Sequence, residues 1–236
     1  DTVWKEIYQV VIGKFYSPAS LGQYARAQQF SSIFSYNLTS IIQRVSFPVL
    51  SSIQNDIPRL KEAYRKVIKS TMLLTFVCML GLAAVAKPMI YVLIGEKWNE
   101  AVPMLQILCF NMMLYPLHAI NLNMLQVQGR SDLFLRLEII KKIIAVGPLC
   151  LGIFVGIYWM LIGSVVAGWF AYYLNAYYSG PFLRYSVWQQ IRDLLPSFFI
   201  AILTSGAMWS LTLLPISFYL IFPIQLVVGL TVLTII

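Results

Sequence analysis

The sequence predicts an all-α membrane protein, a polytopic bundle of about eight transmembrane helices of which the first is truncated. Hydrophobic residues make up 59% of the chain and charged residues only 11%, whereas soluble domains hold about 25% charged residues. The mean hydropathy is +0.76. The apolar runs are long and continuous, which disfavours a membrane β-barrel, whose strands alternate polar and apolar residues.

Charged residues divide the chain into apolar spans and polar connections. Each span needs about 20 apolar residues to cross the hydrocarbon layer. The first half is predicted to begin with a truncated span at 3–12 and a long helix with scattered polar side chains at 21–50. A hydrophilic connection at 54–69 and a span at 70–86, which ends at Lys87-Pro88, are expected to follow. An interfacial turn at 89–98 then leads to a span at 101–127 that is interrupted by Pro116.

The second half begins with a basic connection at 129–142. Two runs without charge follow, at 143–183 and 194–236, and each is long enough for two spans. Turns are expected near 156–158 and near Pro215. The chain starts inside a helix-like segment and stops inside an apolar run, so we expect it to be a fragment of a longer protein, with no cleavable signal.

The distribution of Lys and Arg predicts the orientation. If residue 1 is cytoplasmic, the connections at 54–69, 129–142 and 180–193 hold eleven basic residues and the opposite connections hold three. Such a bias is typical of cytoplasmic loops. An even number of spans then places both ends on the cytoplasmic side. The net charge of +8 is explained by this rule, so no nucleic-acid partner is expected.

A stripe of polar residues runs along the helix at 21–50. Arg26 and Arg44 are 18 residues apart, which is five whole helical turns, and Asn37 shares their face. A charge at the bilayer centre costs about 2.5–3.5 kcal/mol, so such residues usually face a cavity. The stripe, flanked by Gln29, predicts a pathway for an anionic headgroup; the alternative is that the arginines simply reach the lipid headgroups.

The first span offers a second polar group. Lys5 and Gln9 are one helical turn apart and Glu6 is adjacent to Lys5. Lys5 and Gln9 are candidates for the same headgroup cavity, and Glu6 is a candidate site for a coupling H⁺ or Na⁺. The alternative is an interfacial girdle formed with Trp4 and Tyr8.

Polar and small residues in the later spans predict helix packing. His118 is expected to be an interhelical hydrogen-bond partner rather than a proton carrier. Pro116 permits a kink. The small residues that follow are expected to bring helices close together, and they are Gly152, Gly156, Gly163, Ser164, Ala167 and Gly168.

Catalytic, metal and cofactor sites are not expected. The sequence has no paired-carboxylate site, no Gly-rich phosphate loop after a strand and a single histidine. The three cysteines fall inside apolar runs at spacings that match no metal motif. We therefore expect a protein that is not an enzyme.

Several segments resemble the polysaccharide-exporter family of the multidrug/oligosaccharidyl-lipid/polysaccharide transporter superfamily, which exports colanic acid, teichuronic acid and O-antigen units. The resemblance covers residues 1 to about 142. The segments that carry it are IGKFYSP at 12–18, LGQYARAQQF at 21–30, RVSFPVLS at 44–51, GEKW at 95–98, PLHAIN at 116–121 and GRSD at 129–132.

The resemblance implies two six-helix lobes around a central cavity, with an additional terminal hairpin. Residues 1–179 would be the second lobe, truncated at its start, 180–193 a cytoplasmic connection and 194–236 the hairpin. The implied function is flipping of undecaprenyl-pyrophosphate-linked oligosaccharide to the periplasmic leaflet of the bacterial inner membrane. Arg26 matches a cavity arginine of related flippases. The alternative is a cation-coupled multidrug exporter, which would need a cavity rich in acids and aromatics.

Overall fold

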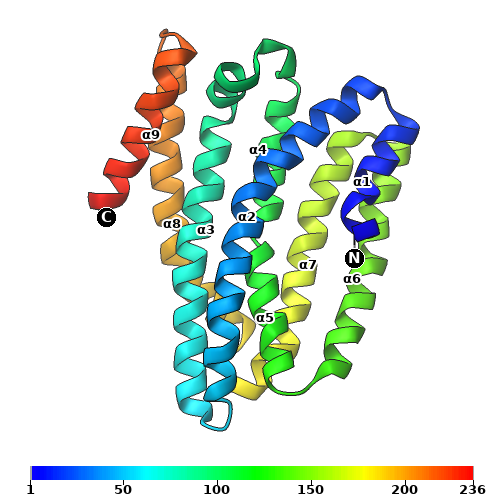
Figure 1. Cartoon of the computed structure of the whole chain (residues 1–236), viewed down its shortest axis with the longest axis vertical. Helices are drawn as coiled ribbons and strands as arrows, with labels where there is room; N and C mark the ends of the chain where they lie inside the picture. Colours follow the sequence, from blue (N-terminus) through cyan, green and yellow to red (C-terminus); the bar gives the residue numbers. More distant parts are fainter. Residues whose placement is uncertain (1, 236) are drawn as a thin grey trace.

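The protein folds into a bundle of long helices (Figure 1). In this computed structural model the backbone is described for residues 2–235 and the side chains for residues 6–234. The α-helices are α1 (Thr2–Phe15), α2 (Pro18–Ser52), α3 (Ile57–Ile94), α4 (Ala101–Met112), α5 (Tyr115–Val127), α6 (Ser131–Phe154), α7 (Ile157–Leu183), α8 (Val187–Ser210) and α9 (Phe218–Ile235), with short 3₁₀ turns η1 (Glu96–Trp98) and η2 (Leu211–Leu213).

The predicted fold class is confirmed. Helices α4 and α5 follow each other along one direction, so residues 2–235 form eight helical segments and contain no strand. Four stretches are long and apolar enough to cross a membrane, namely 57–94, 101–127, 157–183 and 187–213, and α9 is a shorter apolar helix. The chain is therefore a polytopic membrane protein.

Two predicted connections are wrong, because residues 57–69 and 131–142 belong to helices α3 and α6. Asp56 begins α3 by accepting a hydrogen bond from the backbone N–H of Arg59 at 3.1 Å. The predicted interfacial turn at 89–98 is also shorter, since α3 continues through Pro88 to Ile94. Lys, Arg and Glu are good helix formers, so a charged segment marks where a helix leaves the apolar layer and not where it ends.

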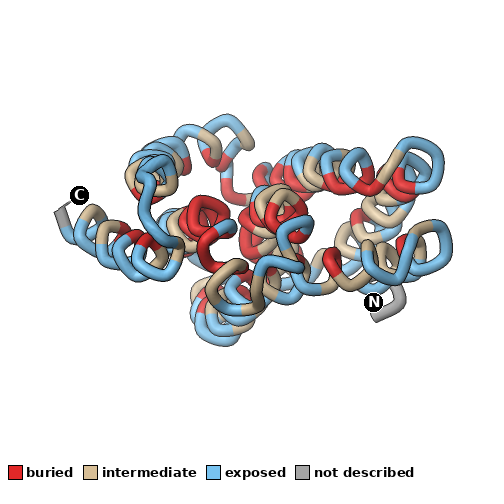
Figure 2. The backbone as a smooth tube through the Cα atoms, turned by 90° about the horizontal axis from the view of Figure 1, so that it is seen from above, coloured by how far each residue is buried: buried red, intermediate tan, exposed pale blue. Residues whose placement is uncertain are grey.

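The helices run along the long axis of the molecule, and α3 lies at the centre of the bundle (Figure 1). The turns α2–α3, α5–α6 and α7–α8 all lie at the lower end in this view. Helix α3 packs against α2, α4, α8 and α9. Figure 2 shows the buried residues concentrated where the central helices meet, while the outer helices are mostly exposed.

The break between α4 and α5 has a defined chemical cause. Pro116 has no N–H, so the carbonyl of Met112 loses its partner within the helix. The hydroxyl of Ser35 on α2 donates to this carbonyl at 2.8 Å. The predicted interruption at Pro116 is confirmed, and a neighbouring helix satisfies the group that the interruption frees.

Small residues bring α6 and α7 together, as predicted. A Cβ at Gly152 would lie 2.5 Å from Sδ of Met160, and one at Gly163 would lie 3.0 Å from Leu151. Gly156 has φ of +150° and occupies the turn between the two helices, a conformation that L side chains rarely adopt.

A buried polar cluster joins α3, α5, α7 and α8 near the lower end of the bundle. The side-chain oxygen of Asn121 accepts hydrogen bonds from Tyr64 at 2.7 Å, Ser179 at 2.8 Å and Gln190 at 3.3 Å. All four side chains are buried. In a membrane the hydrophobic effect does not hold helices together, so these hydrogen bonds help to fix the relative positions of the four helices.

An ionic cluster fastens the start of α8 to α3. Asp193 is 7% exposed and pairs with Arg65 and with Lys69, whose Nζ lies 3.2 Å from its carboxylate. Tyr185 donates to the same carboxylate at 2.8 Å. The residues at 187–210 are thereby held against the central helix, and α9 packs beside them.

Candidate functional site: a cationic cavity between α2, α5 and α6

A cavity with a volume of about 820 Å³ lies between α2, α5 and α6. Helices α2, α5 and α6 supply most of its wall, with Tyr8 from α1 and Ala171 from α7. A volume of this size is typical of small-molecule sites.

Three basic side chains line this cavity. Arg44 comes from α2, and Lys141 and Lys142 come from α6. Lys141 and Lys142 lie about 15 Å from the start of α6 at 1.5 Å per residue, close to the middle of this helix. Basic side chains therefore line the cavity from both α2 and α6.

One acidic side chain lies among these cations. Glu138 accepts a hydrogen bond from Nζ of Lys141, one helical turn away on α6. The two side chains are 28% and 18% exposed, so both are largely enclosed. Phe134, Glu138, Lys141 and Ala145 follow one another at helical spacing and form the face of α6 that lines the cavity.

The α5 wall supplies amide, imidazole and phenol groups. Gln43 donates to Asn123 at 3.4 Å, which connects α2 to α5 inside the cavity. His118 shares a hydrogen bond with Asn175 of α7 at 3.2 Å, which confirms its predicted role as an interhelical partner. The ring of Tyr115 packs edge-on against Tyr36, with centroids 4.9 Å apart. These contacts hold the wall in place and leave polar atoms facing the hollow.

A smaller hollow of about 200 Å³ lies between α1 and α2. Its polar lining includes Glu6, Gln9, Gln28 and Gln29. Gln9 donates to the side-chain oxygen of Gln28 at 3.0 Å. This hollow therefore groups one carboxylate with several amides, and it brings three of the predicted site residues together.

The predicted polar stripe on α2 is divided among three environments. Arg44 faces the large cavity. Arg26 is exposed, donates to Gln29 at 2.9 Å and lies with its guanidinium carbon 5.4 Å from the centroid of the Trp98 ring. Asn37 is exposed and donates to the carbonyl of Ile33 at 2.7 Å. Among the described lining residues of the two hollows, neither Arg26 nor Asn37 appears. The side chain of Lys5 lies outside the described residues.

Lys141 and Lys142 are cavity residues that the sequence reasoning assigned to a cytoplasmic connection. The helical spacing of Phe134, Glu138, Lys141 and Ala145 is the signal that reveals them. No group of three or more His, Cys, Asp or Glu that could hold a metal ion occurs among the described residues.

The fold defines the class of the protein, a polytopic helical membrane protein. The structure is similar to that of Lipid II flippase MurJ in its inward closed conformation, with a TM-score of 0.78 and 18% sequence identity. The similarity covers 99% of this chain and 50% of that one.

The family comparison is more specific. Residues 1–103 match the family described as polysaccharide biosynthesis protein. The chain is 32% identical over 127 residues to teichuronic acid biosynthesis protein TuaB of Bacillus subtilis (strain 168), covering 54% of this chain and 26% of that protein. It is 33% identical over 168 residues to an uncharacterized membrane protein in the cps region of Klebsiella pneumoniae, covering 69% and 33%.

A third relative is lipopolysaccharide biosynthesis protein WzxC of Escherichia coli (strain K12), 26% identical over 143 residues, which are 61% of this chain and 29% of that protein. The chain thus spans about a quarter to a third of the length of these relatives. These comparisons confirm the resemblance to the polysaccharide exporters that the sequence motifs indicate.

Proposed function

We propose that the protein exports polysaccharide precursors by flipping undecaprenyl-pyrophosphate-linked oligosaccharide from the cytoplasmic to the periplasmic leaflet of the bacterial inner membrane. The observation that supports this most is the 820 Å³ cavity with Arg44, Lys141 and Lys142 in its walls. The relatives named for teichuronic acid and lipopolysaccharide biosynthesis support a lipid-linked sugar as the cargo.

The basic side chains compensate for the hydration that the phosphate headgroup loses on leaving water. A charged phosphate cannot cross hydrocarbon unaided, because its dehydration is not compensated there. Arg44 can hold a phosphate through two parallel hydrogen bonds, and Lys141 and Lys142 act as point charges on the α6 wall. The lipid tail remains in the bilayer while the headgroup passes through the bundle.

Transport would follow from movement of one lobe against another. Residues 1–179 form one lobe in this proposal, 180–193 a cytoplasmic connection and 194–236 an additional hairpin. Arg26 and Asn37 would face the other lobe, and Gln9 and Gln29 would bind the sugar. Glu6, in the small hollow, would bind a coupling H⁺ or Na⁺. No cofactor and no catalytic step are required.

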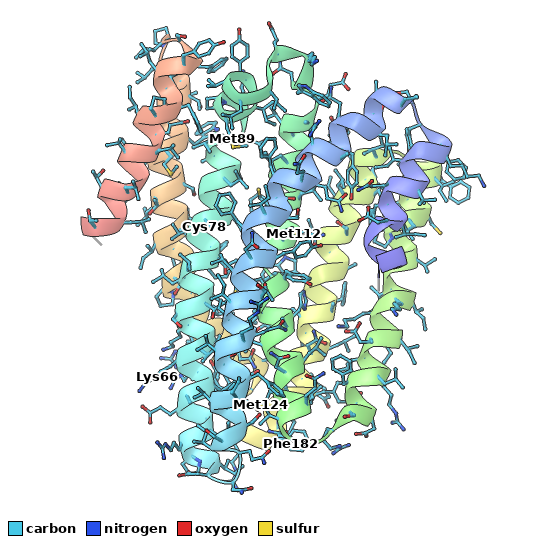
Figure 3. All side chains as sticks on the ribbon, viewed as in Figure 1. Lys66, Cys78, Met89, Met112, Met124 and Phe182 are labelled. Atoms are coloured by element: carbon cyan, nitrogen blue, oxygen red, sulfur yellow. The ribbon has the colours of Figure 1, made fainter. Side chains whose placement is uncertain are left out.

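The decisive experiment measures which leaflet holds the lipid-linked oligosaccharide in cells that depend on the full-length protein for export. Arg44→Gln and Lys141→Gln should each slow its appearance in the outer leaflet about tenfold, because one charged hydrogen bond contributes about 1.5–3 kcal/mol. Arg44→Lys should retain part of the rate. Lys66→Gln is the matched control, because Lys66 is 76% exposed and points away from the bundle (Figure 3).

Two outcomes would contradict the proposal. Flipping at the normal rate in both cavity variants would exclude the cavity as the headgroup path. Export of cationic drugs without any change in lipid-linked oligosaccharide would instead support a cation-coupled multidrug exporter.

A further inference from the structure

The cavity contains one charge that a simple anion-binding site would not need. Glu138 projects into the same hollow as Arg44, Lys141 and Lys142, although a carboxylate repels a phosphate. Its position in the wall is fixed by α6, one turn before Lys141. A glutamate that served only to stabilise the helix would be equally effective on the exposed face of α6, so its place on the cavity face points to a role in the cavity.

Glu138 and Lys141 form an ion pair inside the cavity. The Nζ of Lys141 donates to Oε1 of Glu138, and both side chains are mostly enclosed. An enclosed lysine needs a counterion when no substrate is present, because an unpaired buried charge is costly. Glu138 provides that counterion from the same helix.

The charges also balance against a diphosphate. Among the described lining residues, three basic side chains and one carboxylate give a formal net charge of about +2. A sugar diphosphate diester carries about two negative charges. The cavity with Glu138 in place therefore neutralises such a headgroup without an excess charge that would trap it.

We infer that Glu138 is a displaceable counterion: it pairs with Lys141 in the empty cavity, yields Lys141 to the diphosphate headgroup, and recovers it as the headgroup leaves. This inference rests on the proposed function and specifies how the same site releases its substrate. It assigns Glu138 a positioning role through Lys141, and Glu138 does not itself bind the phosphate.

The test uses the full-length protein in detergent and farnesyl diphosphate as a water-soluble probe. Glu138→Gln should bind the probe about tenfold more tightly than the unaltered protein, because competition for Lys141 is removed. In cells, the same variant should flip the natural substrate more slowly, because release is slower. A merely structural role for Glu138 would lower affinity and flipping together.

Three further variants separate this role from others. Glu138→Asp keeps the charge and should restore near-normal affinity and rate. Glu62→Gln removes the same charge from an exposed pair with Lys66, and it should change neither the affinity for the probe nor the flipping rate. In a Lys141→Gln background, Glu138→Gln should increase affinity by less than about threefold, because its partner is gone.

The outcomes distinguish this inference from the proposed function. If Arg44→Gln and Lys141→Gln weaken probe binding but Glu138→Gln leaves it unchanged or weaker, the counterion role is overturned and the cationic cavity stands. If Glu62→Gln strengthens binding as much as Glu138→Gln, the effect comes from the net charge of the protein, and the counterion role of Glu138 is overturned. If the unaltered protein does not bind the probe, both ideas are overturned.

Discussion

Ser35 is a single side chain on which the α4–α5 break depends. Its hydroxyl donates to the carbonyl of Met112, which Pro116 leaves without a partner. Ser35 is buried, and Met112 lies midway along the length of the bundle (Figure 3), where a freed carbonyl has few other partners. Ser35→Ala should lower the free energy of unfolding by about 1 kcal/mol, measured by thermal denaturation in detergent.

The matched control is Ser32→Ala on the same helix. Ser32 donates to the carbonyl of Gln29 within α2, so its loss leaves no interhelical group unsatisfied. The two variants remove the same atoms. Equal stability of both variants would show that the Met112 carbonyl finds another partner.

At the residue scale, the sequence predicts which residues share a helical face but not which other element each side chain contacts. The 18-residue spacing predicts that Arg26 and Arg44 share one side of α2, yet only Arg44 lines the large cavity. Arg26 lies over Trp98 instead. That contact depends on how the η1 turn folds back onto α2, and the periodicity of one helix contains no information about it.

At the element scale, the sequence predicted the spans well and their ends poorly. Every apolar run corresponds to a helix, because burial in lipid requires one. The connections predicted at 54–69 and 129–142 are wrong because α3 and α6 continue through these charged residues. Lys141 and Lys142 were therefore missed as cavity residues, although their spacing from Phe134 fits one face of α6.

The close approach of α6 and α7 can be tested with one glycine. Gly152 is buried against Met160, and its carbonyl accepts a hydrogen bond from Tyr16, so a side chain there would push α6 from both neighbours. Gly152→Leu should destabilise the protein by about 1–3 kcal/mol. Retention of the full thermal stability would contradict this account of the α6–α7 packing.

Gly147 provides the control for that substitution. It lies on the same helix, and a Cβ there would meet nothing within 4 Å. Gly147→Leu gains the same helix propensity, about 0.8 kcal/mol, without the contact. It should leave the melting temperature of the detergent-solubilised protein unchanged or slightly raised.

At the scale of the whole molecule, Asp193 joins α8 to the rest of the bundle. It is 7% exposed and satisfies both Arg65 and Lys69. Asp193→Asn should destabilise the contact by about 2 kcal/mol, because two cations lose their counterion. Limited proteolysis should then cut the chain near 184–186 faster than in the unaltered protein.

An exposed ion pair is the control for Asp193. Asp132 pairs with Arg130 at 3.1 Å, and both side chains are largely exposed. Exposed pairs contribute about 0–1 kcal/mol, so Asp132→Asn should not change the cleavage rate. Equal cleavage of both variants would mean that Asp193 does not fasten α8.

The packing of α8 and α9 against α3 could not be predicted from the sequence. Helix α9 is apolar on nearly its whole surface, and α8 carries its charged residues in the first two turns only, so periodicity does not show which face of their later turns meets the bundle. The cluster around Asp193 and the hydrogen bond from Gln190 to Asn121 decide it. These contacts join residues more than 60 positions apart, and only the fold reveals them.

Sidedness is the last prediction, and it concerns the two ends of the bundle together. The turns α2–α3, α5–α6 and α7–α8 lie at one end (Figure 1), the end that holds most of the Lys and Arg. The positive-inside rule places that end in the cytoplasm. Asn55→Cys at this end and Asn99→Cys at the other, both exposed, report on opposite sides.

The labelling uses the full-length protein with Cys78, Cys109 and Cys150 replaced, since Cys150 is exposed. A membrane-impermeant thiol reagent added to intact cells should modify Asn99→Cys and spare Asn55→Cys until the membrane is permeabilised. Arg44 lies about 12 Å from the end of α2 that precedes Asn55, at 1.5 Å per residue, so this result would place the proposed headgroup cavity where a substrate made in the cytoplasm can enter. The opposite labelling pattern would invert the bundle and leave the proposed direction of flipping without support.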